Sequence, residues 1–197
     1  MVKRVSQKEN SFFVEIMIPK GWKVWEGESI SINGVCSTVK NINNNFFTVE
    51  YMPETIKKTT VGNFKQKTRV NLEKSLKMND LLDGHIVQGH IDTPGKIIKI
   101  LDIKESKIFK IKIPQKFMKF IAEKGSVSVD GISLTVVDVG RDWFTVSLVS
   151  YTLENTNLGE MRAGDEVNIE TDVLAKYCMR IARYERAHAN KYYKNRK

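Results

Sequence analysis

Residues 34–39 read Gly-Val-Cys-Ser-Thr-Val, and residues 131–136 read Gly-Ile-Ser-Leu-Thr-Val. The correspondence holds at a constant offset of 97 positions, without a gap, between residues 34–73 and residues 131–170. A unit of this size is longer than a solenoid repeat, which runs roughly 20 to 50 residues. The sequence therefore predicts two copies of one small domain, whose two similar pockets can hold two similar molecules.

Both copies have the pattern of an antiparallel β domain. Four stretches either alternate apolar and polar side chains or are rich in aromatic and β-branched residues, as strands are. They are residues 28–32, 46–51, 126–129 and 143–148. Asn33-Gly34 and Asp130-Gly131 are tight-turn signals between strands. The predicted fold is all-β, a tandem pair of similar small antiparallel Greek-key barrels followed by a C-terminal α-helix.

The helix is predicted from an apolar stripe that begins after Asp172. Its members, spaced as on one face of a helix, are Leu174, Tyr177, Cys178, Ile181 and Tyr184. Such a stripe is too exposed for a lone terminal helix, so we expect it to pack on the same helix of neighbouring subunits. The predicted domains are residues 1–86 and 87–172 for the two barrels, and residues 173–197 for an oligomerisation helix with a basic tail.

Charge and composition narrow the function classes. The chain has a net charge of +9, and residues 173–197 hold eight basic residues and one acidic residue, so the repeated body is nearly neutral. This argues against a nucleic-acid partner. No apolar run approaches the roughly 18 residues of a membrane span, residues 1–10 lack the apolar core of a secretory signal, and two cysteines make no disulfide framework. We expect a protein of the cytoplasm, or of an organelle matrix such as a plastid, with no membrane partner.

Five stretches in this order resemble the riboflavin synthase family of two-domain, lumazine-binding enzymes. They are residues 31–39, 52–59, 83–92, 124–137 and 167–177. The resemblance implies a transferase that moves a four-carbon unit between two molecules of 6,7-dimethyl-8-ribityllumazine, giving riboflavin and 5-amino-6-ribitylamino-pyrimidinedione. It implies no cofactor and no metal ion. It also implies a homotrimer whose productive site pairs the first barrel of one subunit with the second barrel of its neighbour, and it admits lumazine synthase as a further partner.

The same resemblance assigns catalytic roles to Cys36, His90, Ser133, Thr135 and Asp172. A thiol at Cys36, or the hydroxyl of its counterpart Ser133, can hydrogen-bond a pteridine or act as a nucleophile; the alternative for Cys36 is a small buried core cysteine. His90 can move protons near neutral pH, which suits deprotonation of a ring methyl group. Asp172 either acts on the ligand or caps the terminal helix. His85 lies five residues before His90, which is the wrong spacing for a shared strand face, and is interpreted as structural.

Substrate contacts are expected from both copies and from the junction between them. From the first copy and the junction they are Cys36, Ser37, Thr38, Glu50, Tyr51, Met52, Pro53, Glu54, Thr55, Gly89, His90 and Ile91. From the second copy they are Lys124, Ser133, Leu134, Thr135, Leu148, Val149, Ser150, Tyr151, Thr152 and Leu153. The Lys124 ammonium could stabilise an anionic lumazine, or it could be a solvated loop lysine. Ser37 departs from the family, which usually has leucine there, and so does the Ser150-Tyr151 pair.

The largest departure is at the start of the first copy. Upstream of the repeat the offset is 95, so Lys96 is the counterpart of Met1, and the second copy has residues 87–95 where the first has nothing. The family's opening segment, with a phenylalanine important for activity, is thus missing. We expect either a truncated start or a first barrel that is short of a strand. Two alternative functions remain: a non-catalytic lumazine- or flavin-binding protein of the same fold, and a small barrel that binds nucleic acid through its basic tail.

Overall fold

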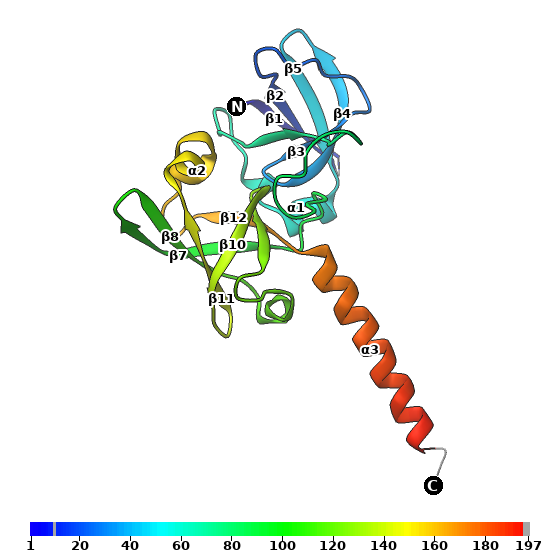
Figure 1. Ribbon diagram of the computed structural model, residues 1–197. Helices are drawn as coiled ribbons and strands as arrows, with labels where there is room; N and C mark the ends of the chain where they lie inside the picture. Colours follow the sequence, from blue (N-terminus) through cyan, green and yellow to red (C-terminus); the bar gives the residue numbers. More distant parts are fainter. Residues whose placement is uncertain (10, 195–197) are drawn as a thin grey trace.

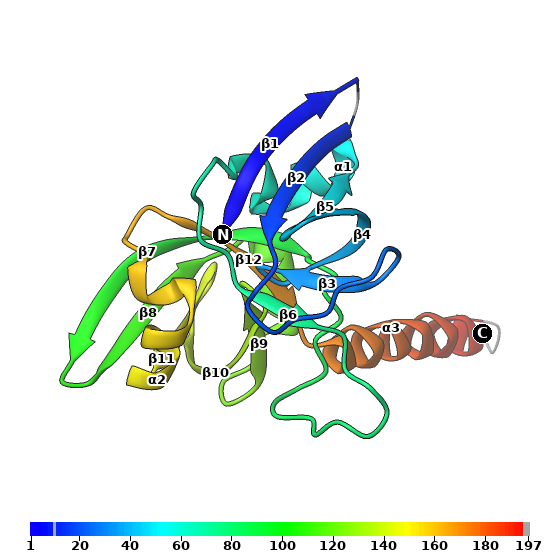
Figure 2. The same ribbon diagram turned by 90° about the horizontal axis from the view of Figure 1, so that it is seen from above.

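The computed structural model describes residues 1–9 and 11–194, so residues 195–197 of the predicted basic tail lie outside it. Two sheets lie side by side, and one long helix projects from them (Figure 1). Seen from above, the hairpin of the first two strands and this helix leave the sheets in different directions (Figure 2). In chain order the elements are β1 (Val2–Lys8), β2 (Ser11–Met17), β3 (Ser29–Ile32), β4 (Val35–Asn43), β5 (Phe46–Tyr51), α1 (Pro53–Lys58), η1 (Thr60–Asn63), β6 (Leu72–Lys74), β7 (Thr93–Ile103), β8 (Ser106–Lys112), η2 (Gln115–Phe120), β9 (Ser126–Val129), β10 (Ile132–Val139), β11 (Trp143–Leu148), α2 (Ser150–Asn155), η3 (Asn157–Glu160), β12 (Glu166–Thr171) and α3 (Val173–Lys194).

The two halves share one topology. The first sheet has the order β1-β2-β5-β4-β3-β6, and the second is a closed barrel in the order β10-β11-β8-β7-β12-β9, with β9 paired to β10. All these pairs are antiparallel. Even the bulge recurs, between Val39 and Asn41 in β4 and between Val136 and Asp138 in β10. The predicted tandem repeat of antiparallel β domains is confirmed.

The halves differ at one edge, between β1 and β6. In the second half, residues 93–96 at the start of β7 pair with β12 and close the barrel. In the first half β1 has 7 residues where β7 has 11, and it pairs with β2 but not with β6 in the described part of the chain. The corner is still held, because Val2 N–H donates to Thr68 O at 2.9 Å, as Ile97 N–H donates to Asp165 O at 2.9 Å. The first sheet therefore has six strands, as the second has, and β1 is shorter than β7.

Each half is built around its own core, and the two cores differ at one matched pair of positions. In the first core the Ser37 and Tyr51 hydroxyls are hydrogen-bonded at 2.8 Å, and Ser37 Oγ also donates to Val35 O at 2.8 Å. Leu134 and Leu148 occupy the same two positions in the second core. Burial raises the pKa of the Tyr51 hydroxyl, so it stays protonated and can donate. The first core thus has a hydrogen-bonded polar pair, Ser37 and Tyr51, where the second core has a pair of leucines.

The two predicted tight turns meet at the centre of the molecule. Gly34 and Gly131 both have positive φ, at +78° and +86°. A Cβ on Gly34 would lie 2.6 Å from Gly131 N, and a Cβ on Gly131 would lie 2.9 Å from Gly34 N. Only glycine permits this approach of the two backbones, so the turns fix how the halves pack as well as how their strands connect.

Reciprocal asparagine contacts join the halves around these turns. Asn71 Nδ2 donates to Asp130 O at 3.1 Å, and its repeat counterpart Asn168 donates through Nδ2 to Asn33 O at 2.8 Å. Because each bond is the repeat-related copy of the other, the two halves are related by an approximate two-fold axis at this interface. The repeat seen in the sequence is thus also a symmetry of the packing.

Asp130 breaks this symmetry, because its counterpart Asn33 carries no charge. The carboxylate is fully buried and accepts the Asn168 N–H at 2.7 Å and an Asn157 Nδ2 hydrogen at 2.8 Å. Burial raises the pKa of Asp130 to about 7, against the opposing effect of these two hydrogen bonds. The interface therefore holds a carboxyl group that is close to half-protonated near neutral pH.

The helix α3 starts directly after Asp172, for which the sequence left a helix cap and a ligand role as alternatives. Asp172 Oδ1 accepts the Leu174 N–H at 2.9 Å, which confirms the helix-cap interpretation of Asp172. The predicted stripe is exposed along the helix, with Leu174, Tyr177 and Ile181 at 60%, 65% and 58%. No helix in the described ranges is both long and apolar enough to cross a membrane.

Candidate functional site

The central candidates lie on equivalent faces of two equivalent strands. Along β4, Cys36 and Thr38 are exposed while their neighbours are buried, and along β10 Thr135 is exposed and Ser133 partly so. Cys36 and Thr38 therefore share one face of β4, and Ser133 and Thr135 share one face of β10, since successive side chains of a strand point to opposite sides. Cys36 is a free, exposed thiol. This rules out the alternative of a buried core cysteine.

A cavity of about 620 Å³ joins the two faces, and it is lined by both Cys36 and Ser133. It lies against β3 and β4 of the first half, the turn before β10 in the second half, and the chain that connects the two halves. Other lining residues are Ser31, Gly131, His85, Val87, Gln88 and Gly89. Residues 97 positions apart in the repeat, one with a thiol and one with a hydroxyl, therefore border the same space.

The connecting chain, residues 84–92, is here called the junction segment, and it touches both candidates. A Cβ on Gly84 would lie 2.8 Å from Ser133 Cβ and Oγ, and a Cβ on Gly89 would lie 2.7 Å from Cys36 Cβ. Both glycines have positive φ, at +124° and +79°. Gly89 O also accepts the Cys36 N–H at 2.9 Å. Glycine is required at these two points because the segment crosses Ser133 and Cys36 without room for a side chain.

His85, which the sequence analysis interprets as structural, lies against the candidate site residue Ser133. Its Nδ1 lies 2.7 Å from Ser133 Oγ, and its backbone N–H donates to the same oxygen at 3.3 Å. Burial lowers the pKa of His85, although the charges of Asp172 and Glu170 oppose this. A neutral imidazole can take a proton from a hydroxyl. The spacing to His90 was misleading because the junction segment is not a strand, so the two-residue period does not apply to it.

The other charged candidates lie apart from this pair. His90, the residue that follows Gly89, is exposed. Lys124 is exposed and has φ of +59°, whereas its counterpart in the first copy is Gly27 with φ of +82°. A non-glycine residue in the left-handed region costs on the order of 1 kcal/mol. That cost is consistent with a role for the lysine side chain itself, since a glycine would fit there more easily.

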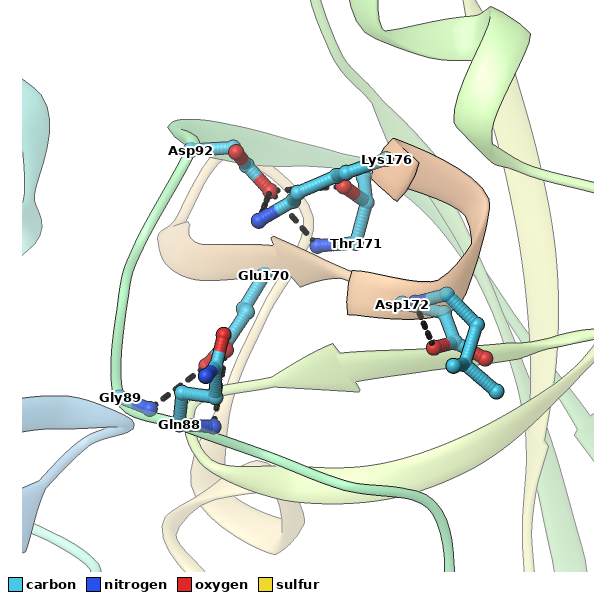
Figure 3. Close-up of polar contacts among 8 residues, drawn as sticks. Gln88, Gly89, Asp92, Glu170, Thr171, Asp172 and Lys176 are labelled. Carbon is cyan, nitrogen blue, oxygen red and sulfur yellow. Dashed lines mark hydrogen bonds and ion pairs between the residues drawn. The ribbon is translucent and has the colours of Figure 1, made fainter. Parts of the chain in front are cut away.

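Two acidic residues tie the junction segment to the second barrel and to α3 (Figure 3). Glu170 is 1% exposed, and its two carboxylate oxygens accept the N–H groups of Gln88 and Gly89, each at 2.9 Å. Asp92 Oδ2 accepts both the N–H and the hydroxyl of Thr171 at 2.8 Å and pairs with Lys176 Nζ at 2.8 Å. The path of the junction segment is thus held by charged hydrogen bonds, which are stronger than neutral ones.

The expected backbone segments form the same corner in each half. Residues 50–55 run from the end of β5 into α1, and residues 148–153 run from the end of β11 into α2. Thr59 Oγ1 donates to Thr55 O, and Thr156 Oγ1 donates to Thr152 O, both at 2.7 Å. Neither corner, nor Lys124 or Asp172, is among the residues described as lining the 620 Å³ cavity. The structure therefore gathers Cys36, Ser133 and Gly89 and leaves the two corners elsewhere on their barrels.

Four of the residues predicted to contact the substrate have side chains buried in the two cores, where a ligand cannot touch them. Ser37, Tyr51 and Leu148 are at most 3% exposed, and Leu134 is 8% exposed. A ligand at these positions would meet backbone atoms. Across the described ranges, no group of three or more His, Cys, Asp or Glu residues is placed to hold a metal ion.

Comparison with known proteins matches both halves to one domain. Residues 1–75 and 88–172 each match the family model of the lumazine binding domain. The chain is 45% identical to the riboflavin synthase of Actinobacillus pleuropneumoniae over 151 residues, which is 77% of this chain and 70% of that protein. It is 37% identical to the riboflavin synthase of Bacillus subtilis over 155 residues, which is 79% of this chain and 72% of that protein.

Solved structures show the same fold. The structure of LumP complexed with riboflavin superposes with a TM-score of 0.80 at 24% identity, covering 86% of this chain and 93% of that one. LumP complexed with 6,7-dimethyl-8-(1'-D-ribityl) lumazine superposes with a TM-score of 0.78 at 23% identity over the same shares. The arrangement of two similar β domains is thus shared with proteins whose sequences are much more distant.

Proposed function

The chain belongs to the lumazine-binding domain family, and from this premise we propose that it is an enzyme, a transferase that acts as a riboflavin synthase. The observation that carries the proposal is that both copies of the domain match one family model, within a chain 37–45% identical to curated riboflavin synthases over most of its length. The two copies place different groups, a thiol at Cys36 and a hydroxyl at Ser133, at the same position.

The reaction uses two molecules of 6,7-dimethyl-8-ribityllumazine, one for each barrel. A four-carbon unit passes from the donor molecule to the acceptor, giving riboflavin and 5-amino-6-ribitylamino-pyrimidinedione, without a cofactor. A pair of barrels suits two copies of one substrate because each presents an equivalent face. The chemical difference between the faces suits the different fates of donor and acceptor.

The side chains divide between proton transfer and ligand binding. Ser133 and His85 form a hydroxyl–imidazole pair at 2.7 Å, in which the imidazole can take the hydroxyl proton. Cys36 offers an exposed thiol to the other ligand. His90, an exposed residue that follows Gly89 in the junction segment, can carry protons between solvent and the reacting methyl groups. Lys124 stabilises negative charge on a bound lumazine, and Thr38 and Thr135 offer hydroxyls from the same faces.

The site is completed by assembly into a homotrimer. The corners at residues 50–55 and 148–153 do not line the space between Cys36 and Ser133 within one chain. A neighbouring subunit can bring the first barrel of one chain against the second barrel of another. The exposed apolar stripe of α3 provides the contact between subunits, since each buried aliphatic side chain contributes about 1.5 to 3 kcal/mol.

The test is to supply 6,7-dimethyl-8-ribityllumazine without any added cofactor. Lumazine absorbance should fall and flavin absorbance should rise, with two lumazines consumed for each riboflavin formed. The second candidate, a non-catalytic lumazine- or flavin-binding protein, is motivated by the fold shared with LumP. Saturable binding of the lumazine with no flavin formed would favour this candidate and overturn the proposal.

A further inference from the structure

Glu170 is a buried carboxylate of the second barrel whose contacts lead to the first barrel. On β12 it lies across from Ser128 of β9, which lies across from Ser133 of β10, so the three residues form one row across the sheet. Ser128 is fully buried, and its hydroxyl has no hydrogen-bond partner among the described residues. The row lies under the junction segment, which Glu170 holds through two backbone N–H groups.

From Glu170 the contacts continue to Cys36 in two steps. Glu170 Oε2 accepts the Gly89 N–H at 2.9 Å, and Gly89 O accepts the Cys36 N–H at 2.9 Å. Gly89 also packs so closely on Cys36 that an added Cβ would lie 2.7 Å from Cys36 Cβ. The backbone position of Cys36 therefore depends on a carboxylate 134 residues later in the chain, on the other barrel.

The repeat provides an internal comparison for this contact. The counterpart of Glu170 is Glu73 on β6, which is exposed and has no hydrogen bond or ion pair through its carboxylate in the described part of the chain. The same residue type at the same repeat position is thus buried and bonded in only one copy. Burial of a carboxylate is costly unless it is hydrogen-bonded, and the Gln88 and Gly89 N–H groups provide these bonds.

We propose that Glu170 is a positioning residue of the reaction: by fixing the junction segment it sets the position of Cys36, and so links the second barrel to chemistry on the first. The proposal rests on the function proposed above for the reaction itself. Its structural part, the link from Glu170 through Gly89 to Cys36, can be measured without any turnover. Glu170 does not touch the substrate in this role and acts only through the segment it holds.

The test compares Glu170→Gln with Glu166→Gln, the same change on an exposed residue of the same strand. Glutamine keeps one acceptor oxygen and turns an amide N–H toward the other backbone N–H, so one bond to the junction segment is lost. Alkylation of Cys36, an exposed free thiol, by iodoacetamide is followed by peptide mass spectrometry, and each rate is compared with that of the unsubstituted protein treated in parallel. We expect the Cys36 rate to rise by about 10- to 100-fold in Glu170→Gln, the scale of one lost hydrogen bond to a charged group, and to stay unchanged in Glu166→Gln.

In turnover, Glu170→Gln should lower kcat about ten-fold while KM changes less than about two-fold, because the binding surfaces are retained. Gly89→Ala, whose Cβ would press on Cys36, should give the same kinetic pattern, and the double variant should be no worse than the worse single variant. An unchanged Cys36 alkylation rate in a folded Glu170→Gln protein overturns the proposal, and so do additive effects of the two changes. Absence of flavin formation by the unsubstituted protein would instead overturn the proposed function, while the alkylation rates still test the link.

Discussion

Position for position, Cys36 of the first barrel and Ser133 of the second have the same place on β4 and β10, but their surroundings differ. Ser133 has an imidazole at 2.7 Å, whereas Cys36 has the Gly89 backbone against it. The first sheet is open between β1 and β6, and the second is a closed barrel. After β6 the chain forms an irregular loop, and after β12 it enters α3. The comparison shows that a duplicated fold supplies two equivalent faces, and that the connecting and terminal segments make them chemically distinct.

The largest effect, on oligomer size and activity, should come from removing α3, the helix that follows the second barrel. Truncation after Asp172, or Ile181→Asp, should convert the proposed trimer into smaller species in light scattering, because the apolar stripe of α3 is lost or interrupted. Activity should fall with the oligomer and recover at higher protein concentration. Truncation after Arg186 is the control, since it keeps the whole stripe and should leave the oligomer size unchanged. A fully active monomer would contradict both the trimer and the shared site.

The next effect concerns the chemical difference between the two faces. Ser133→Ala and His85→Ala should each lower kcat by about 100-fold, and the double variant should be no worse, because the two groups act as a pair. Cys36→Ala should give a different pattern of kcat and KM. Since burial lowers the pKa of His85, the imidazole stays neutral at neutral pH, and the acid limb of kcat/KM should lie below the ordinary histidine value of about 6.5. Identical defects in Cys36→Ala and Ser133→Ala would argue against separate donor and acceptor roles.

A smaller effect is expected at the interface, where Asp130 faces its uncharged counterpart Asn33. The pKa of Asp130 is about 7 in the folded protein and its ordinary value is 3.8, so between these values the folded state binds the extra proton. The contribution of Asp130 to stability is present below about pH 4 and is lost as the pH rises through about 7. Unfolding by urea from pH 4 to 8 should show this slope, and Asp130→Asn should remove it.

The converse change is the control for this prediction. Asn33→Asp places a second carboxyl group at the repeat-related position and should steepen the loss of stability with rising pH. If the free energies of unfolding of Asp130→Asn and of the unsubstituted protein change in parallel with pH over this range, the prediction that the pKa of Asp130 is raised is wrong.

The smallest effect concerns the matched core positions. Tyr51→Phe removes the hydroxyl that bonds Ser37, and should cost about 1 kcal/mol in the free energy of unfolding measured with urea. The cost is modest because Ser37 keeps its bond to Val35 O. Changing both Ser37 and Tyr51 to leucine copies the second core and should recover most of this loss. A double variant less stable than Tyr51→Phe would show that the two cores are not interchangeable at this pair.

Much of the fold could be predicted from the sequence because it depends on local or repeated patterns. The offset of 97 positions predicts two equivalent domains, and the structure has equivalent strands in the same order. The two-residue period of a strand places Cys36 with Thr38 and Ser133 with Thr135. The short helices α1 and α2 were not predicted, because six residues are too few to show a helical period. Their threonine caps, at Thr59 and Thr156, are the signals that could have revealed them.

The sequence by itself determined the repeat, the two faces and the family, since each of these is written in neighbouring residues or in a comparison of the two copies, and it left a helix cap at Asp172 as one of two alternatives. Only the tertiary structure decided that His85 meets Ser133 and that Glu170 holds the junction segment against Cys36. The raised pKa of Asp130 was decided there too. These features join residues tens of positions apart, and they depend on which groups are removed from water together. Burial and long-range contact are properties of the packed chain, so no local period or spacing can encode them.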